Sequence, residues 1–220
     1  MTMELFAGRK VVIATMHKKE EVIIPVLEQL GLIPVIPKYF DTDRFGTFSG
    51  EVDRLNDPLQ TARLKCKAAG EQYDCSLAIS SEGSFGPHPT ILFAPADDEI
   101  IVLSDLKNNL EFKARIVTTK TNFYGARMKS WQDVEKFANT ALFPSHALIA
   151  RKEKNTLDGI VKGIHSWEQL NDVALTYLNA YGQFFLETDM RAMFNPTRMK
   201  VIEEVTLKLL RSIQRLCPRF

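Results

Sequence analysis

Lys10-Val-Val-Ile-Ala-Thr15 is a continuous apolar run that ends in a hydroxyl residue. A run without polar alternation is typical of a strand that is buried on both faces, as the strands of parallel sheets are. Residues 20–30 follow with apolar side chains at helical spacing, and Gly31 stands where a glycine commonly ends a helix. Residues 32–36 are a second apolar run, which Pro34 assigns to the edge of a sheet. This order of strand, loop, helix and strand predicts a parallel crossover.

The rest of the chain alternates in the same way between apolar runs and helical patterns. Asp57-Pro58 is a helix-start pair, in which the aspartate caps the helix and the proline occupies its first turn. Residues 81–89 are rich in serine, glycine and proline and predict a turn. Ser130 and Ser166 each open a capping box. Further strands are predicted at residues 76–80, 100–103, 110–117, 147–151 and 184–186, and a last helix at residues 197–215.

These elements predict one α/β domain over residues 1–220. Its expected architecture is a layered mixed β-sheet with helices on both faces and a long C-terminal helix. The chain is 45% hydrophobic and 25% charged, as ordinary globular proteins are, and its 220 residues suffice to bury a core.

Charge and composition narrow the class of protein. The formal net charge is +1, so no overall field recruits nucleic acid or a membrane surface. Residues 191–220 are an exception, because seven basic and two acidic residues give this segment a net charge of +5. No apolar run approaches the roughly 18 residues of a membrane span. The three cysteines form no C-x-x-C pair, which favours a reducing compartment, and a cytoplasmic location is expected.

The loop after the first strand, Thr15-Met16-His17-Lys18-Lys19, is the first candidate site. It combines a hydroxyl, an imidazole and two ammonium groups at a helix N-terminus, where free backbone N–H groups favour phosphate or carboxylate. Because lysines at this end of a helix oppose its dipole, a compensating anion is expected. The alternative is a solvated turn with a helix cap.

Carboxylates in two loops are the second candidate site. Glu82 lies just past an expected strand and is flanked by Ser81 and Ser84, at the end of the sheet where α/β proteins bind ligands. Glu51 lies in a long polar loop. Mg²⁺ takes one or two carboxylates together with phosphate oxygens, so Glu51 and Glu82 would suffice for it if they meet in space. Otherwise both are solvated loop residues.

Polar residues beside the apolar stripe of the helix at residues 57–73 form a third group. Thr61 and Lys65 fall on one flank of that stripe and Arg63 on the other. Such basic residues commonly extend into water, and ligand binding is the alternative.

Two later clusters are weaker candidates. Ser145-His146 precedes a strand. His146 either contributes to ligand binding or is a buried histidine with a structural role. The segment of residues 187–198 contains Asp189, Arg191, Asn195 and Arg198, which either bind a ligand or cap the last helix, with Asn195 as its N-cap and Pro196 as its first residue.

Five motifs of this chain resemble a bacterial family of unknown function over nearly the whole length. They are Ala14-Thr15-Met16-His17-Lys18-Lys19-Glu20, Phe45-Gly46-Thr47-Phe48-Ser49-Gly50-Glu51, Thr61-Ala62-Arg63-Leu64-Lys65, Ser81-Glu82-Gly83-Ser84-Phe85-Gly86-Pro87-His88-Pro89 and residues 189–198. The resemblance implies no activity. Members of that family continue into a cysteine-rich, zinc-ribbon-like tail, of which Cys217 would be the first cysteine.

The first 95 residues or so also resemble the nucleotide pyrophosphatases of the inosine-triphosphatase and Maf type. Those enzymes have a strand ending in Ala-Thr, a lysine entering a helix, a loop glutamate, an Ala-x-x-Lys helix and an acidic residue before glycine. The matching positions here are Thr15, Lys19, Glu51, Lys65 and Glu82. This chain departs from the pattern at two positions: His17 stands in place of asparagine, and Ala147 stands where Ser-His-Arg would have its arginine. The resemblance implies an inosine-triphosphatase-like fold in the N-terminal half.

The leading prediction is a Mg²⁺-dependent nucleotide pyrophosphatase or a related phosphohydrolase. Residues 1–128 would hold the nucleotide, and residues 129–220 would supply helix–strand units and the last helix. Glu51 and Glu82 would carry the metal and act in catalysis. The predicted substrate-binding residues are Thr15, His17, Lys19, Arg54, Arg63, Lys65, Ser81, Ser84, His88, Ser145, His146, Asp189, Arg191, Asn195 and Arg198.

Two other functions are alternatives to the phosphohydrolase. A non-catalytic nucleotide or anion sensor would use the same residues without turnover. A nucleic-acid-associated module would use the basic segment of residues 191–220, and ranks third because no aromatic residues are interleaved with its charges. No membrane partner is expected, and the sequence is compatible with a homodimer.

Overall fold

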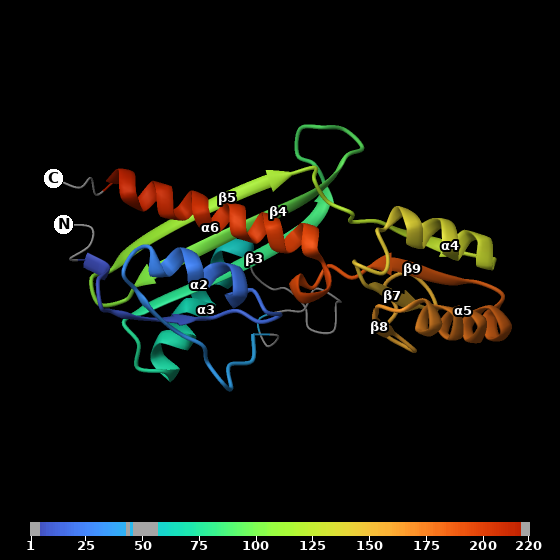
Figure 1. The fold of residues 1–220 in the computed structure, drawn as a ribbon, viewed down its shortest axis with the longest axis horizontal. Coiled ribbons are helices and arrows are strands. Elements are labelled where there is room, and N and C mark those ends of the chain that lie inside the picture. The colour runs from blue at the N-terminus through green and yellow to red at the C-terminus, as the bar shows by residue number, and fades with distance from the viewer. Residues whose placement is uncertain (1–4, 43–44, 46–56, 217–220) are drawn as a thin grey trace.

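The computed structural model describes residues 5–42, 45 and 57–216, and shows two β-sheets side by side along the long axis (Figure 1). Glu51, Arg54 and Cys217 lie outside the described residues. The larger sheet has five strands in the order β2-β1-β3-β4-β5. Its strands are β1 (Lys10–Ile13), β2 (Ile33–Val35), β3 (Leu77–Pro87), β4 (Pro95–Asp105) and β5 (Leu110–Thr118).

The larger sheet is mixed and has helices on both faces. β1 pairs in parallel with β2 and β3, whereas β3, β4 and β5 are antiparallel. Helices α2 (Glu20–Glu28) and α6 (Pro196–Leu216) share one core with the sheet, and α3 (Pro58–Gln72) shares a second core with it. Strand alternation separates the two cores, because Ile79 and Leu103 face α2 and α6 while Ala78 and Val102 face α3. The predicted fold class is confirmed.

A second, antiparallel sheet in the order β6-β9-β7-β8 was not foreseen. Its strands are β6 (Gly125–Met128), β7 (Leu148–Arg151), β8 (Val161–Ile164) and β9 (Phe184–Thr188). Helices α4 (Trp131–Thr140) and α5 (Trp167–Tyr181) share its core, and Ser130 and Ser166 cap them as predicted. β6 and β8 have only four residues each, too few for a clear periodic pattern. Within the described ranges no helix combines the length and apolarity needed to cross a membrane.

The prediction of a turn at residues 81–89 is wrong for residues 81–87. β3 continues through them as one strand, paired residue by residue with β4 from Glu82 opposite Ile100 to Pro87 opposite Pro95. Backbone pairing with β4 overrides the local turn preference of serine and glycine, and Pro87 is tolerated because it ends the strand. The turn begins at His88, whose Nδ1 accepts hydrogen bonds from the backbone N–H groups of two residues that follow it, at 3.1 and 3.2 Å. His88 therefore has a local structural role.

The start of α6 confirms the predicted cap and connects it to neighbouring segments. Asn195 is fully buried, and its side-chain oxygen accepts the backbone N–H of Arg198 at 3.0 Å. Its amide nitrogen donates to Oδ1 of Asn122 at 2.8 Å. His146 also contributes, because its Nε2 accepts the backbone N–H of Thr197 at 3.3 Å. The free N–H groups at the start of α6 thus have protein partners.

We expect Asn195→Ala to lower the free energy of unfolding by about 2 kcal/mol or more, because it removes a helix cap and leaves buried polar groups without partners. Ser166→Ala is the matched control, since the exposed cap of α5 contributes about 1 kcal/mol. Urea denaturation of both variants measures the difference. Equal losses would show that the additional hydrogen bonds of Asn195 contribute nothing.

Candidate functional site

Buried ionisable side chains gather where β1 ends. β1 pairs with β3 only as far as Ile79, whereas β3 runs on to Pro87. Beyond this point lies a set of six charged residues, each no more than 7% exposed, which we call the buried charge cluster. Charged residues are rarely buried to this extent unless they are paired, so each member requires a partner or a function. The members are Lys19, Lys65, Glu82, Asp97, Glu99 and Arg198.

The loop between β1 and α2 delivers Lys19 to the cluster. His17 and Lys18 both have left-handed backbone conformations, with φ of 65° and 60°, which non-glycine residues rarely adopt. Nζ of Lys19 donates to the backbone oxygen and to Oγ of Ser81, at 3.2 and 3.1 Å. Lys19 directly precedes α2, whose N-terminus has no side-chain cap. Two consecutive strained residues and a buried ammonium group are features that accumulate at functional sites.

The ammonium of Lys19 is held in an unfavourable environment. The pKa of Lys19 is lowered to about 8. Burial is the largest cause and the positive charge of Arg198 acts in the same direction, while the negative charges of Glu99 and Glu82 oppose it. No described carboxylate lies within ion-pair distance of it. The hydrogen-bond partners of Lys19 are neutral, so its positive charge is not directly compensated.

His17 also lies among positive charges. Its pKa is lowered to about 4. Burial is the largest cause, the positive charges of Lys19, Arg198 and Arg191 act in the same direction, and the negative charge of Asp189 opposes them. The imidazole is therefore neutral at pH 7. These interactions place the loop between the cluster and the segment that follows β9.

Glu82 forms an ion pair with Lys65 on the α3 face of the sheet. Both side chains are less than a tenth exposed. The ammonium of Lys65 also lies 6.0 Å from the ring centroid of Phe45. Lys65 thus does not extend into water, and it neutralises the carboxylate that the sequence offered as a metal ligand.

Arg198 and Glu99 form the second buried pair, on the opposite face. Nε of Arg198 donates to Oε1 of Glu99 at 2.6 Å, and Nη1 donates to the backbone oxygen of Met190. The guanidinium lies 5.0 Å from the ring centroid of Phe85. Gly83 leaves room for this pair, because a Cβ at this position would lie 2.1 Å from Oε1 of Glu99 and would displace its carboxylate.

Asp97 and Glu99 are cluster members that sequence reasoning missed. Both oxygens of Asp97 and Oε2 of Glu99 are buried and have no hydrogen-bond partner in the part of the chain that the structure describes. The pKa of Asp97 is raised to about 8. Burial is the largest cause and the negative charge of Glu99 adds to it, while the positive charges of Arg198 and Lys19 oppose it. The residue spacing contained a signal for these two residues. Asp97 and Glu99 alternate in phase with Ile101 and Leu103, so they lie on the face of β4 that α2 and α6 cover.

Other predicted residues have structural partners. Asp189 is fully buried and accepts hydrogen bonds from Nη2 of Arg191 at 2.6 Å and from the backbone N–H of Gly163 at 3.2 Å. Ser145 donates to the backbone oxygen of Leu142 at 2.6 Å and lies 2.9 Å from Nδ1 of His146. Burial lowers the pKa of His146. Asp189 therefore positions Arg191, and the Ser145–His146 pair supports the start of α6.

Arg63, Ser84 and Thr15 complete the predicted set. Arg63 lies outside the cluster, where Nε and Nη2 donate to the carboxylate of Glu111 on β5 at 2.7 and 2.8 Å. Ser84 is half-buried on β3, on the same face as Glu82. Oγ1 of Thr15 is buried at the end of β1 and has no hydrogen-bond partner. Thr15 thus has a hydroxyl available at the cluster's end of the sheet.

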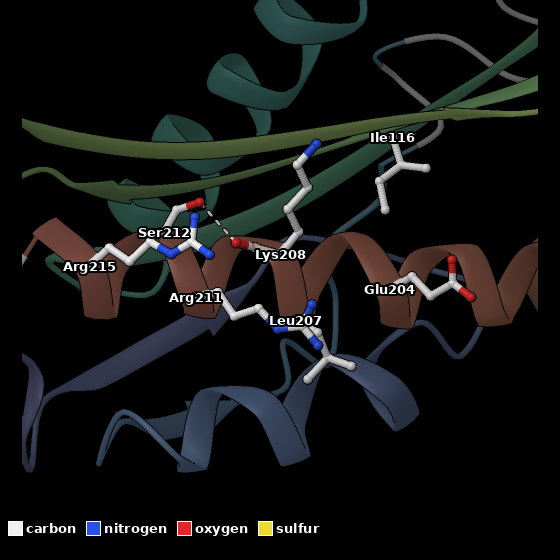
Figure 2. Close-up of a pocket in the computed structure, with 7 residues that line it drawn as sticks. All are labelled: Ile116, Glu204, Leu207, Lys208, Arg211, Ser212 and Arg215. Atoms are coloured by element: carbon white, nitrogen blue, oxygen red, sulfur yellow. Dashed lines mark hydrogen bonds between the residues drawn. The ribbon is translucent and has the colours of Figure 1, made fainter.

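A separate groove of about 480 Å³ runs along α6 beside β5 (Figure 2). Lys208, Arg211 and Arg215 line it together with Glu204 and Ile116. Nζ of Lys208 donates to the backbone oxygen of Arg115 at 2.8 Å, so one hydrogen-bond donor of its ammonium group is already occupied. The groove is basic, but its side chains are held less firmly than those of the buried charge cluster.

Fold and site together define an α/β protein with paired and unpaired charges buried at the end of its central parallel strand. Residues 65–220 match the family described as a domain of unknown function, DUF6671, and the chain belongs to that family. No curated protein matches the sequence. The matched region contains every member of the buried charge cluster except Lys19.

We expect Glu82→Ala to lower the free energy of unfolding by about 3 kcal/mol, because it leaves the buried ammonium of Lys65 without a partner. Glu111→Ala is the matched control, since it breaks the more exposed pair with Arg63 on the same helix and should cost about 1 kcal/mol or less. Chemical denaturation compares the two variants. If both are as stable as the wild type, the Lys65–Glu82 pair has no structural role.

The lowered pKa of Lys19 predicts a pH dependence of stability. Between about pH 8 and pH 10.5, the unfolded chain keeps a proton on Lys19 that the folded chain has lost, so rising pH favours the folded state. Wild-type protein should therefore gain stability relative to Lys19→Met across this range, and the difference should be constant below it. Denaturation of both proteins at a series of pH values provides the measurement. A difference that does not change with pH would contradict the lowered pKa.

Proposed function

We propose that this chain binds a phosphorylated small molecule, of the nucleotide class, at the end of β1 and hydrolyses it with the help of Mg²⁺. The observation that carries the proposal is the buried ammonium of Lys19, which has only neutral hydrogen-bond partners and lies at the N-terminus of α2. A phosphate group at this position would compensate the positive charge of Lys19.

The surrounding residues suit a phosphate for further reasons. Arg198 adds a second buried positive charge that interacts electrostatically with Lys19. His17 is neutral, so it offers hydrogen bonds without adding charge to the loop. Thr15 contributes a buried hydroxyl without a partner. Donors of several kinds thus surround the position where Lys19 requires an anion.

The roles of these residues in hydrolysis follow from their charge. Lys19 would stabilise negative charge that develops on the phosphoryl oxygens, which is commonly the largest contribution to catalysis. Burial strengthens this effect, because the charge acts in a medium of low dielectric constant. Mg²⁺, when bound, polarises a phosphoryl oxygen and lowers the pKa of a coordinated water. Glu82 suits the metal poorly, because Lys65 already neutralises its carboxylate.

Two alternatives retain some support. A sensor would use the buried ammonium of Lys19 to bind the same anion without turnover. The basic groove along α6 favours association with nucleic acid (Figure 2). Binding measurements separate these alternatives from the leading proposal.

We expect isothermal titration of the full-length chain to detect binding of nucleoside triphosphates, including deaminated ones, and we expect Lys19→Met to weaken it about ten-fold or more. Lys18→Met is the matched control, because the side chain of Lys18 is two-thirds exposed and should leave the affinity unchanged. Release of phosphate or pyrophosphate in the presence of Mg²⁺ tests hydrolysis.

Three results would contradict the proposal in different ways. Triphosphate binding without turnover would contradict hydrolysis and would support the non-catalytic sensor. Binding that is the same in wild type and Lys19→Met would remove Lys19 from the site. If the chain instead binds oligonucleotides with an affinity that falls steeply with salt and is lost in an Arg211→Ala, Arg215→Ala double variant, the α6 groove is the functional surface.

A further inference from the structure

The two acidic residues on the buried face of β4 lie side by side. Asp97 and Glu99 are two positions apart on one strand, so their side chains point to the same face of the sheet. Glu99 lies opposite Gly83 and Asp97 lies opposite Phe85. The carboxylate of Glu99 extends over Gly83, where any larger residue would collide with it. The fold thus holds two carboxylates together on one face of β3 and β4.

The protein leaves most of these carboxylate oxygens without a partner. Arg198 satisfies Oε1 of Glu99 at 2.6 Å, but Oε2 of Glu99 and both oxygens of Asp97 have no hydrogen-bond donor among the described residues. Asp97 is 1% exposed and Glu99 is fully buried, so bulk solvent does not reach these carboxylates. Buried polar atoms are nearly always hydrogen-bonded, and three unpartnered oxygens on neighbouring carboxylates indicate a missing electropositive ligand.

We infer that Asp97 and Glu99 form a binding site for a divalent metal ion of the Mg²⁺ and Mn²⁺ class. A divalent cation would satisfy oxygens from both carboxylates at once, with water in its remaining positions.

The donor set selects the class of metal. Carboxylate oxygens are hard ligands that suit Mg²⁺ and Mn²⁺, whereas zinc sites are built mainly from cysteine and histidine. Mg²⁺ is commonly held by one or two carboxylates together with water and phosphate oxygens, so a third protein carboxylate is not required. Both residues interact electrostatically with Lys19, so the metal lies near the proposed phosphate position.

This site deepens the proposed function by moving the metal from Glu51 and Glu82 to Asp97 and Glu99. It can be tested with the metal alone, so its outcome does not depend on nucleotide binding or turnover. Mn²⁺ binding without any nucleotide binding would contradict the proposed function and support this site. Nucleotide hydrolysis by the wild type, together with an unchanged metal affinity in the Asp97 variant, would support the proposed function and contradict this metal site.

The matched control lies next to Asp97 on the same strand. Asp98 points to the opposite face, where Oδ1 accepts a hydrogen bond from Nε of Arg115 at 2.7 Å. Asp97→Asn and Asp98→Asn are therefore the same chemical change at adjacent positions, inside and outside the proposed site. Each is nearly isosteric, and the far-ultraviolet circular dichroism of each variant shows whether it folds.

We expect electron paramagnetic resonance titration of the full-length wild-type chain with Mn²⁺ to detect one bound ion per chain. Asp97→Asn should raise the Kd for Mn²⁺ by about ten-fold or more, as loss of a ligand does, and Asp98→Asn should leave it unchanged. As a second measurement, Mg²⁺ should raise the Tm of wild type and of Asp98→Asn, and should not raise that of Asp97→Asn.

Three outcomes would overturn the inference. The first is that wild-type protein binds no Mn²⁺ at millimolar concentrations. The second is that Asp97→Asn and Asp98→Asn bind Mn²⁺ equally well. The third is that Asp97→Asn raises the Tm without metal and Mg²⁺ has no effect on wild type, which would show a carboxyl pair that shares a proton instead of a metal.

Discussion

The buried ion pair between Arg198 and Glu99 connects the parts of this molecule. Arg198 lies in the first turn of α6, and Glu99 lies in the larger sheet. The same guanidinium donates to the backbone oxygen of Met190, which follows strand β9 of the smaller sheet. A buried guanidinium costs much desolvation energy unless its hydrogen bonds are satisfied, so the contacts around Arg198 have little freedom to change. Gly83 is part of this constraint, because a Cβ at this position would displace the carboxylate of Glu99 and the guanidinium of Arg198 from their present contact.

The candidate site follows from how charges are balanced around this pair. Lys65 and Glu82 neutralise each other on the α3 face of the sheet, and Arg198 neutralises one oxygen of Glu99 on the other face. Lys19 remains as an ammonium without a carboxylate, and Asp97 remains as a carboxylate without a donor. Uncompensated groups of opposite sign at one end of a sheet suit a ligand that carries both phosphate and metal.

Several features of the fold were predictable because they depend on near neighbours in the chain. Asp57, Ser130 and Asn195 each cap a helix through a backbone N–H three residues later, an interaction within a single turn. The prediction for residues 81–87 was wrong for the opposite reason. Their conformation is set by pairing with β4, whose partner residues are more distant along the chain, as Ser81 opposite Ile101 and Glu82 opposite Ile100 are.

The sequence by itself determined the alternation of strands and helices, the helix caps and the candidate residues Lys19, Lys65 and Glu82, because periodicity and capping act over a few residues. Only the tertiary structure decided which charges are paired. Glu82 forms an ion pair with Lys65, and Arg63 forms one with Glu111 outside the cluster. Asp97 lies beside Glu99, which is paired with Arg198. The physical reason is that an ion pair or an unpaired buried charge depends on distances in space and on exclusion of water, and neither is encoded in residue order alone.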